Sequence, residues 1–210
     1  MNLIDLVDSL LETAGPAPIV VAGDPVLRRP SAPYDGQLGD ERLARLIELM
    51  RATMLDAPGV GLAAPQIGIP LRLAVIEDPA EVPDEIRDIK GRVPQPFRVL
   101  VNPAYTPLGE RVAFFEGCLS VPGYQAVVAR HRTVLLHGED EKGQRIDEEF
   151  TGWPARIVQH ETDHLDGTLY LDRAESRSLC ANHQVAERWA QPTPEHAARE
   201  LDFPVPSRTA

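Results

Sequence analysis

The spacing of apolar positions along the chain changes between helical and strand-like periods, which predicts an α+β protein. Residues 1–18 contain a short amphipathic helix followed by the breaker stretch 15–18. A stronger helix begins at Asp40, and its apolar side chains form one stripe: Leu43, Leu46, Ile47, Met50 and Met54. Because such a stripe is typical of a helix packed on a hydrophobic core, we interpret it as core.

Shorter apolar runs predict strands between this helix and residue 150. Residues 71–76 and 98–102 fit strands, and the acidic, proline-bearing insertion 77–96 between them is expected at the surface. Residues 127–139 and 144–150 flank a turn signal and predict an antiparallel pair.

A further helix is expected after these strands. Thr151 and Gly152 can cap it, Pro154 suits its first turn, and Gly167 is a plausible stop. Apolar residues at helical spacing lie between these signals. The strands therefore lead into a helix that carries the most informative motif of the chain.

Composition limits the class of protein. The 210 residues are 43% hydrophobic and 25% charged, which suits one soluble domain with peripheral extensions. The 20 prolines and 15 glycines indicate many turns and short elements, not a bundle of long helices.

Charge and hydropathy narrow the expected partners and compartment. The net charge of −11 argues against direct nucleic-acid binding. No apolar run approaches a membrane span, so we expect no membrane partner. Asp5, Asp8 and Glu12 stand where a secretory signal would carry basic residues, and we therefore expect a cytoplasmic protein.

The motif at 160–164 reads His-Glu-Thr-Asp-His. On a helix, His160 and His164 lie on one face a turn apart, so both imidazoles can reach one metal ion, and Glu161 lies beside that ion. The same pattern also occurs by chance on solvated helices. Because a catalytic zinc-like centre normally takes three protein ligands, the third ligand decides between these interpretations.

Several residues compete for the place of the third ligand. A metzincin would carry histidine at position 170, where this chain has Tyr170. A thermolysin-like site would use a downstream glutamate, and Glu175 or Glu187 could serve, although no local pattern selects either. A thiolate from Cys118, which follows the flexible Gly117, is a further candidate.

Other motifs carry less weight. The second cysteine, Cys180, fits a buried apolar side chain in a helical tail. His131 and His137 fall in the predicted sheet, where structural roles are more common than metal ligation. The Gly-x-Gly pair in residues 59–66 lacks the third glycine and the preceding strand of a dinucleotide-binding fingerprint.

Three segments taken together closely resemble peptide deformylases: Gly59-Val-Gly-Leu-Ala-Ala-Pro-Gln66, Glu116-Gly-Cys-Leu-Ser120 and Gln159-His-Glu-Thr-Asp-His164. Segments 23–28 and 165–170 extend the resemblance, which covers about residues 19–175. We therefore expect an N-terminal extension at 1–18, a catalytic domain at 19–175 and a partly helical C-terminal tail at 176–210. The implied fold is α+β, with antiparallel sheets around a central helix that carries the His-Glu-x-x-His motif.

The resemblance implies one divalent metal ion held by Cys118, His160 and His164, with water at the open position. The family uses iron(II) in cells, and zinc(II), nickel(II) or cobalt(II) can occupy the same ligands. One thiolate and two imidazoles are acceptable to all of these ions, so the sequence does not select among them.

The implied reaction is hydrolysis of the N-formyl group from the N-terminal formylmethionine of newly synthesised proteins, with release of formate. The resemblance makes Glu161 the proton shuttle and gives the oxyanion two donors, the side chain of Gln66 and the backbone N–H of Leu119. Gly61 belongs to the motif that shapes the substrate channel, and Glu116 is implied to orient neighbouring groups.

The implied partners are N-formylmethionyl nascent polypeptides, with transient proximity to the ribosome. The tail after Arg173 carries four arginines against five acidic residues, so it is not a basic ribosome-binding arm. Two alternatives stay open: a zincin-type metallopeptidase, suggested by the motif helix alone, and a non-catalytic, metal-stabilised peptide-binding protein. The presence of both Glu161 and Gln66 counts against the second.

Overall fold

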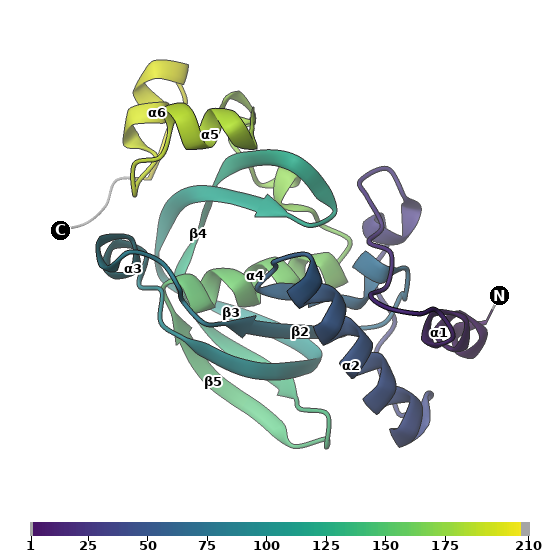
Figure 1. Ribbon diagram of the computed structural model, residues 1–210. Coiled ribbons are helices and arrows are strands. Elements are labelled where there is room, and N and C mark those ends of the chain that lie inside the picture. The colour runs from purple at the N-terminus through teal and green to yellow at the C-terminus, as the bar shows by residue number, and fades with distance from the viewer. Residues whose placement is uncertain (1, 207–210) are drawn as a thin grey trace.

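The computed structural model describes residues 2–206 (Figure 1), and the predicted helices near the N-terminus, after residue 38 and at the motif are all confirmed. The α-helices are α1 Leu3–Leu11, α2 Gly39–Asp56, α3 Asp84–Lys90, α4 Trp153–Leu165, α5 Asn182–Arg188 and α6 Glu195–Leu201. Short 3₁₀ turns lie at Pro25–Arg28, Ala64–Ile67, Tyr170–Asp172 and Ser176–Ser178.

Within the described range, six strands form one antiparallel sheet in the order β1-β2-β3-β4-β5, with β6 paired to β4. The strands are β1 Gly61–Ala63, β2 Leu73–Asp78, β3 Gln95–Cys118, β4 Val121–Glu139, β5 Arg145–Thr151 and β6 Cys180–Ala181. The predicted pair around the turn at 140–143 corresponds to β4 and β5. β3 and β4 form a long, curved hairpin that arches over α4 (Figure 1).

Three sequence-based expectations need correction. The predicted strand at 98–102 is only part of the 24-residue β3. Register shifts near residues 101–104 and 108–111 allow pairing with β4 to continue beyond the prolines and the glycine there. The insertion 77–96 is not wholly superficial: it holds α3, and Asp78 is fully buried against Arg92. Cys180 lies in β6 and not in a helix, because it pairs with Gln125 at the edge of β4.

The core explains why the helices adopt these positions. Every residue of the predicted α2 stripe is buried, and the same cluster takes in Val7 of α1. A second apolar cluster joins α4 to the sheet through Ala155, Val158 and Leu165. In Figure 1, α4 lies at the centre of the molecule, with strands below it and the β3–β4 arch above it.

Helix α4 begins and ends where the sequence predicts. Gly152 is its N-cap and Pro154 lies in its first turn, where a missing N–H costs no helical hydrogen bond. After the helix, Gly167 has φ +75°, and a Cβ there would lie 2.8 Å from the backbone of Arg28. Glycine is therefore needed at 167 both for the left-handed backbone and for the close contact.

Among residues 2–206, no helix combines the length and the apolar character needed to cross a membrane.

Candidate metal centre and its pocket

Three candidate ligands come together at α4: two lie on the helix itself and the third lies at the end of β3. Cys118 is the last residue of β3, whereas His160 and His164 lie on successive turns of α4. One donor atom from each residue lies within 4.8 Å of the other two, and Cys118 Sγ is 3.2 Å from His164 Nε2. The β3–β4 hairpin thus supplies the third donor that the motif helix lacks. Glu175 and Glu187, the glutamates considered for that place, are not part of this group.

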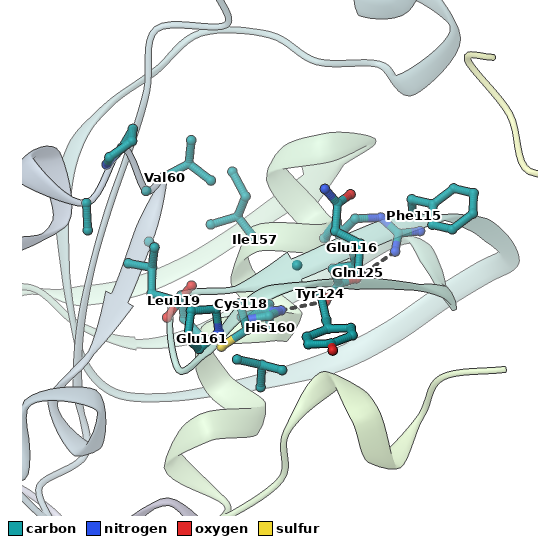
Figure 2. Close-up of a pocket in the computed structure, with 18 of the residues that line it drawn as sticks. Val60, Phe115, Glu116, Cys118, Leu119, Tyr124, Gln125, Ile157, His160 and Glu161 are labelled. Atoms are coloured by element: carbon teal, nitrogen blue, oxygen red, sulfur yellow. Dashed lines mark hydrogen bonds and ion pairs between the residues drawn. The ribbon is translucent and has the colours of Figure 1, made fainter. Parts of the chain in front are cut away.

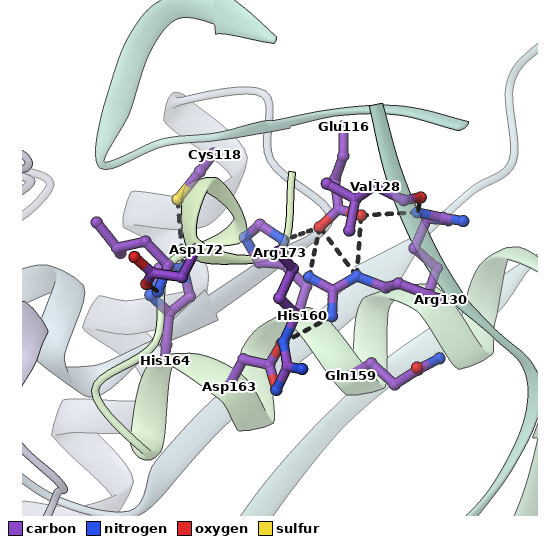
Figure 3. A network of polar contacts seen from close by, with 12 residues as sticks. Glu116, Cys118, Val128, Arg130, Gln159, His160, Asp163, His164, Asp172 and Arg173 are labelled. Atoms are coloured by element: carbon purple, nitrogen blue, oxygen red, sulfur yellow. Dashed lines mark hydrogen bonds and ion pairs between the residues drawn. The ribbon is translucent and has the colours of Figure 1, made fainter. Parts of the chain in front are cut away.

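The imidazole of His160 is oriented by a buried carboxylate. Glu116 Oε1 is 2.5 Å from His160 Nδ1, which leaves the Nε2 edge of the ring for a metal ion. Glu116 also accepts hydrogen bonds from Arg130 at 2.7–3.1 Å and from Arg156 at 2.8 Å. Figure 3 shows Glu116 between His160 and Arg130. The carboxylate is therefore fixed on one side by two guanidinium groups and on the other by the candidate ligand.

A second buried carboxylate, Asp163, extends this network along α4. Its oxygens accept hydrogen bonds from Arg130 at 2.7 Å, from Arg173 at 2.7 and 2.9 Å, and from the hydroxyl of Tyr105 at 3.2 Å. Arg130 is 2% exposed and joins Asp163 to Glu116. Because buried charges persist only when they are paired, the network holds the motif helix against β4.

Gln66 directs a hydrogen-bond donor towards the candidate ligands. Its Oε1 accepts a hydrogen bond from the N–H of Ala63 at 2.8 Å, so the other end of the amide must be the NH₂ group. That Nε2 lies 3.3 Å from Ser120 Oγ and 3.6 Å from Cys118 Sγ. The structure brings Gln66 and Leu119 into the wall of the same pocket as Cys118.

Glu161 lies beside the three candidate ligands, tightly packed against Gly61. A Cβ built at Gly61 would lie 2.2 Å from Glu161 Oε1. Only glycine leaves room for the carboxylate in this position. Glu161 Oε2 is buried and accepts no hydrogen bond from the described residues. The carboxylate therefore has an unused acceptor atom in the pocket wall.

Burial and neighbouring charges separate the protonation behaviour of these groups. Burial raises the pKa of Glu161 to about 7, against the opposing effect of His160. Burial would also raise the pKa of Glu116, but Arg130 and His160 outweigh it and hold that pKa well below its usual range. A divalent cation at the three donors would lower the pKa of Glu161 again, because a nearby positive charge favours the carboxylate.

The pKa values of His160 and His164 are also shifted in opposite directions. Burial tends to lower the pKa of His160, but hydrogen bonds with Cys118 and Glu116 raise it well above the ordinary value. For His164, burial and the charge of His160 together lower the pKa well below the ordinary value, which favours the neutral imidazole that binds metals.

A cavity of about 600 Å³ opens onto these residues (Figure 2). Val60, Leu119 and Ile157 provide apolar wall, and Cys118, His160 and Glu161 contribute its polar groups. Its volume is within the range usual for small-molecule and peptide sites. Figure 2 shows Phe115 at the end of the pocket far from Val60.

Sequence reasoning missed most of the buried charge network. Arg130 and Arg156 did not enter the predicted site, although Arg130 shares a strand face with the buried Ala126 and Val128. The sequence pattern that could have predicted this network is an arginine at a position where the strand alternation expects a buried apolar residue. Gln159 has a structural role: its amide bonds both the N–H and the C=O of His131, which ties α4 to β4.

The excluded histidines lie outside the centre. His137 pairs with Asp147 on the neighbouring β5 at 2.6 Å. His131 Nδ1 lies 3.4 Å from the carbonyl oxygen of Gly109, at a register shift in the middle of β3. Neither belongs to the group of Cys118, His160 and His164.

The residues present fit a divalent metal ion. One thiolate and two imidazoles are a chemically suitable donor set, and their donor atoms lie within 4.8 Å of one another. A three-donor set with a free carboxylate and an amide donor in one pocket defines a metal-dependent hydrolase.

Comparisons with known proteins identify the family. The model of the polypeptide deformylase family matches residues 16–179. Peptide deformylase 3 of Streptomyces avermitilis is 68% identical over 97% of this chain and 92% of its own length. Peptide deformylase 1 of Streptomyces coelicolor is 65% identical over 99% and 96%.

The solved structures agree with these relatives. A Met-Ala-Ser-bound class I type b peptide deformylase from Acinetobacter baumannii has a TM-score of 0.69 and 34% identity. The match covers 77% of this chain and 99% of that one. The chain therefore belongs to the polypeptide deformylase family, whose members are metal-dependent hydrolases that remove the formyl group from N-formylmethionine peptides.

Proposed function

We propose that Cys118, His160 and His164 hold the catalytic divalent ion of this deformylase and that Glu161 transfers the proton. The observation that carries the proposal is the convergence of the three donors within 4.8 Å, in a pocket that also exposes Glu161. A bound ion at this position supplies Lewis acidity, which lowers the pKa of water and polarises the formyl carbonyl. The remaining steps fall to the residues of the chain.

Glu161 accepts a proton from the attacking water and delivers it to the departing amine. Its carboxylate is held beside the candidate ligands by its contact with Gly61, and its Oε2 accepts no other hydrogen bond within residues 2–206. Formation of the C–O bond and cleavage of the C–N bond then release formate and the free N-terminus of methionine.

Gln66 and Leu119 stabilise the negative charge that develops on the formyl oxygen. The Gln66 amide is oriented by Ala63, so its donor is fixed before substrate binds. Preorganised donors of this kind lower the barrier because they need no reorganisation during the reaction. The backbone N–H of Leu119, next to Cys118, is the second proposed donor.

The methionine side chain occupies the apolar part of the pocket, and the following residues bind as an added strand. Val60 and Ile157 are proposed to contact methionine. β1 lies at the edge of the sheet and pairs only with β2 among the described strands, so its free side can bond an extended peptide. The structure of the Acinetobacter relative contains bound Met-Ala-Ser, which supports a peptide that begins with methionine as the ligand.

The physiological metal is proposed to be iron(II), with zinc(II), nickel(II) and cobalt(II) able to replace it. Mixed thiolate and imidazole ligation accepts each of these ions, and availability in the cell then decides occupancy. Exposure to oxygen is expected to inactivate an iron(II) enzyme through the metal or Cys118.

We further propose that the enzyme acts in the cytoplasm on nascent chains, in transient proximity to the ribosome and without direct nucleic-acid binding. The net charge of −11 supports the absence of nucleic-acid contact. The proposed catalytic domain is 19–175, with an extension at 1–18 and a tail at 176–210; the family match to 16–179 supports these boundaries.

The test is formate release by anaerobically metal-loaded protein. We expect release from a formyl-Met-Ala-Gln amide peptide and much slower reaction of its acetylated counterpart, because a bulkier acyl group fits the donors less well. Internal cleavage of unformylated peptides would favour the metallopeptidase alternative. Stoichiometric metal without formate release would favour the non-catalytic alternative.

A further inference from the structure

We propose that Lys90 binds an acidic side chain at the third residue of the formylated substrate, in a groove between α3 and the C-terminal segment 182–194. This inference rests on the proposed function and adds a specificity determinant outside the metal centre. It is carried by the position of Lys90, by the groove around it and by the spacing of an extended peptide.

Lys90 is a partly buried cation that has no anion within the described residues. Its ammonium lies 4.5 Å from the centre of the Trp153 ring and 5.6 Å from that of Phe114. Neighbouring Arg92 and Arg156 both hold buried carboxylates, whereas none of the ion pairs within residues 2–206 includes Lys90. Burial, together with Arg156 and Arg92, lowers the pKa of Lys90 to about 8. A ligand carboxylate would relieve this unpaired charge.

Two cavities meet at Lys90. It lines the 600 Å³ pocket together with Phe115 and Gln125, and the same three residues line an adjacent cavity of about 130 Å³. Val185 and Trp189 from the C-terminal segment also line the adjacent cavity. The pocket that holds the metal centre therefore continues as a groove past Lys90.

The spacing of an extended peptide places its third residue at this groove. Trp153 precedes Ile157 by four residues on α4, which corresponds to about 6 Å along the helix. In an extended chain, the third Cα lies about 7 Å beyond that of methionine, and both side chains point to the same face. A substrate with methionine near Ile157 thus directs its third side chain towards Lys90, and its second side chain away from it.

The experiment compares kcat/KM for amidated peptides that differ only in charge at one position. We expect metal-loaded wild-type enzyme to prefer formyl-Met-Ala-Glu amide over formyl-Met-Ala-Gln amide by about threefold to tenfold. When the glutamate or glutamine is placed at the second residue instead, the ratio of the two kcat/KM values should be near one. Amidation removes the terminal carboxylate, which would otherwise mimic the acidic side chain.

Variants then test whether Lys90 is responsible. Lys90→Met should bring the ratio to about one, whereas Lys90→Arg should preserve it. The chain contains one other lysine, Lys142, in the turn before β5, and Lys142→Met is the matched control that should retain the wild-type ratio.

Two results would overturn the inference: a ratio near one in the wild-type enzyme, or an unchanged ratio in Lys90→Met. The wild-type peptide series decides the first without any variant, so it does not depend on how the variants fold. Absence of formate from every formylated peptide would instead contradict the proposed function and this inference together.

Discussion

At the scale of single residues, the contact between Gly61 and Glu161 sets the position of the proposed proton shuttle. The carboxylate occupies the space that a Cβ at 61 would fill. The requirement for glycine therefore comes from the Glu161 carboxylate and not from an unusual backbone angle, since Gly61 has no positive φ. This gives the Gly-x-Gly pair a physical role that dinucleotide binding did not explain.

Gly61→Ala is expected to lower kcat by about 100-fold while leaving the metal content unchanged. The added methyl group must displace Glu161, and a shift of about 1 Å in a reacting group costs that much. Formate release and metal analysis on the same sample measure the two effects.

Gly59→Ala is the matched control, because the closest contact of its new Cβ, at 2.9 Å, would be with the end of the Leu119 side chain. We expect a loss of less than about tenfold there, since that side chain can move. Equal losses in the two variants would contradict the special role of Gly61.

At the scale of elements, α4 is a buried helix whose buried ion pairs are made mainly with β3 and β4. Glu116 and Arg130 come from the two strands of the hairpin, and Asp163 and Arg156 come from the helix. The hairpin therefore brings Cys118 to the histidines and also fixes the orientation of His160.

Arg130→Met is expected to reduce the free energy of unfolding by about 3–5 kcal/mol. It leaves Glu116 and Asp163 buried with fewer partners, and breaking a buried ion pair has this cost. Urea unfolding measures the change. Arg145→Met removes an exposed side chain of β5 and should leave the free energy of unfolding unchanged within experimental error. A similar loss in both variants would show that the buried network contributes no more to stability than an exposed ion pair.

The partly buried Lys90 of α3 is expected to make the free energy of unfolding depend on pH. The pKa of Lys90 falls from the ordinary 10.5 to about 8 through burial, Arg156 and Arg92. Between these values the unfolded chain binds more protons, so the contribution of Lys90 to the free energy of unfolding rises with pH. Below pH 8 the full cost of burying the charged amine is present.

The measurement is urea unfolding of wild type and Lys90→Met at pH 7 and pH 10. We expect the wild type to gain about 1–3 kcal/mol relative to the variant at the higher pH. Trp153 and Phe114 are the aromatic neighbours that partly stabilise the charged form. A difference that is independent of pH would show that Lys90 is not desolvated in the folded protein.

At the scale of the whole molecule, local patterns predicted α1, α2 and α4 well, missed α3, and predicted the long strands poorly. Helical periodicity and caps are encoded within a few residues, so α1, α2 and α4 could be found from spacing alone. The extent of β3 could not, because its prolines and glycine read as breaks until pairing with β4 is known.

The candidate site was also predictable only where its residues lie close together in the sequence. His160, Glu161 and His164 share one short motif, but Cys118 is 42 residues from His160 and meets it only through the β3–β4 hairpin. The resemblance to a known family supplied that connection. Arg156 and Lys90 escaped prediction because their importance depends on long-range burial, which a single sequence does not display.

The central claim is that three residues hold the metal while Glu161 moves the proton. The most direct measurement is metal content and formate release, determined together for anaerobically prepared wild type, Glu161→Gln and Cys118→Ala, with Cys180→Ala as the control cysteine. We expect Glu161→Gln to keep its metal and lose at least 100-fold in kcat, Cys118→Ala to lose most of its metal, and Cys180→Ala to match wild type. Full turnover in Glu161→Gln, or full metal content in Cys118→Ala, would contradict the claim.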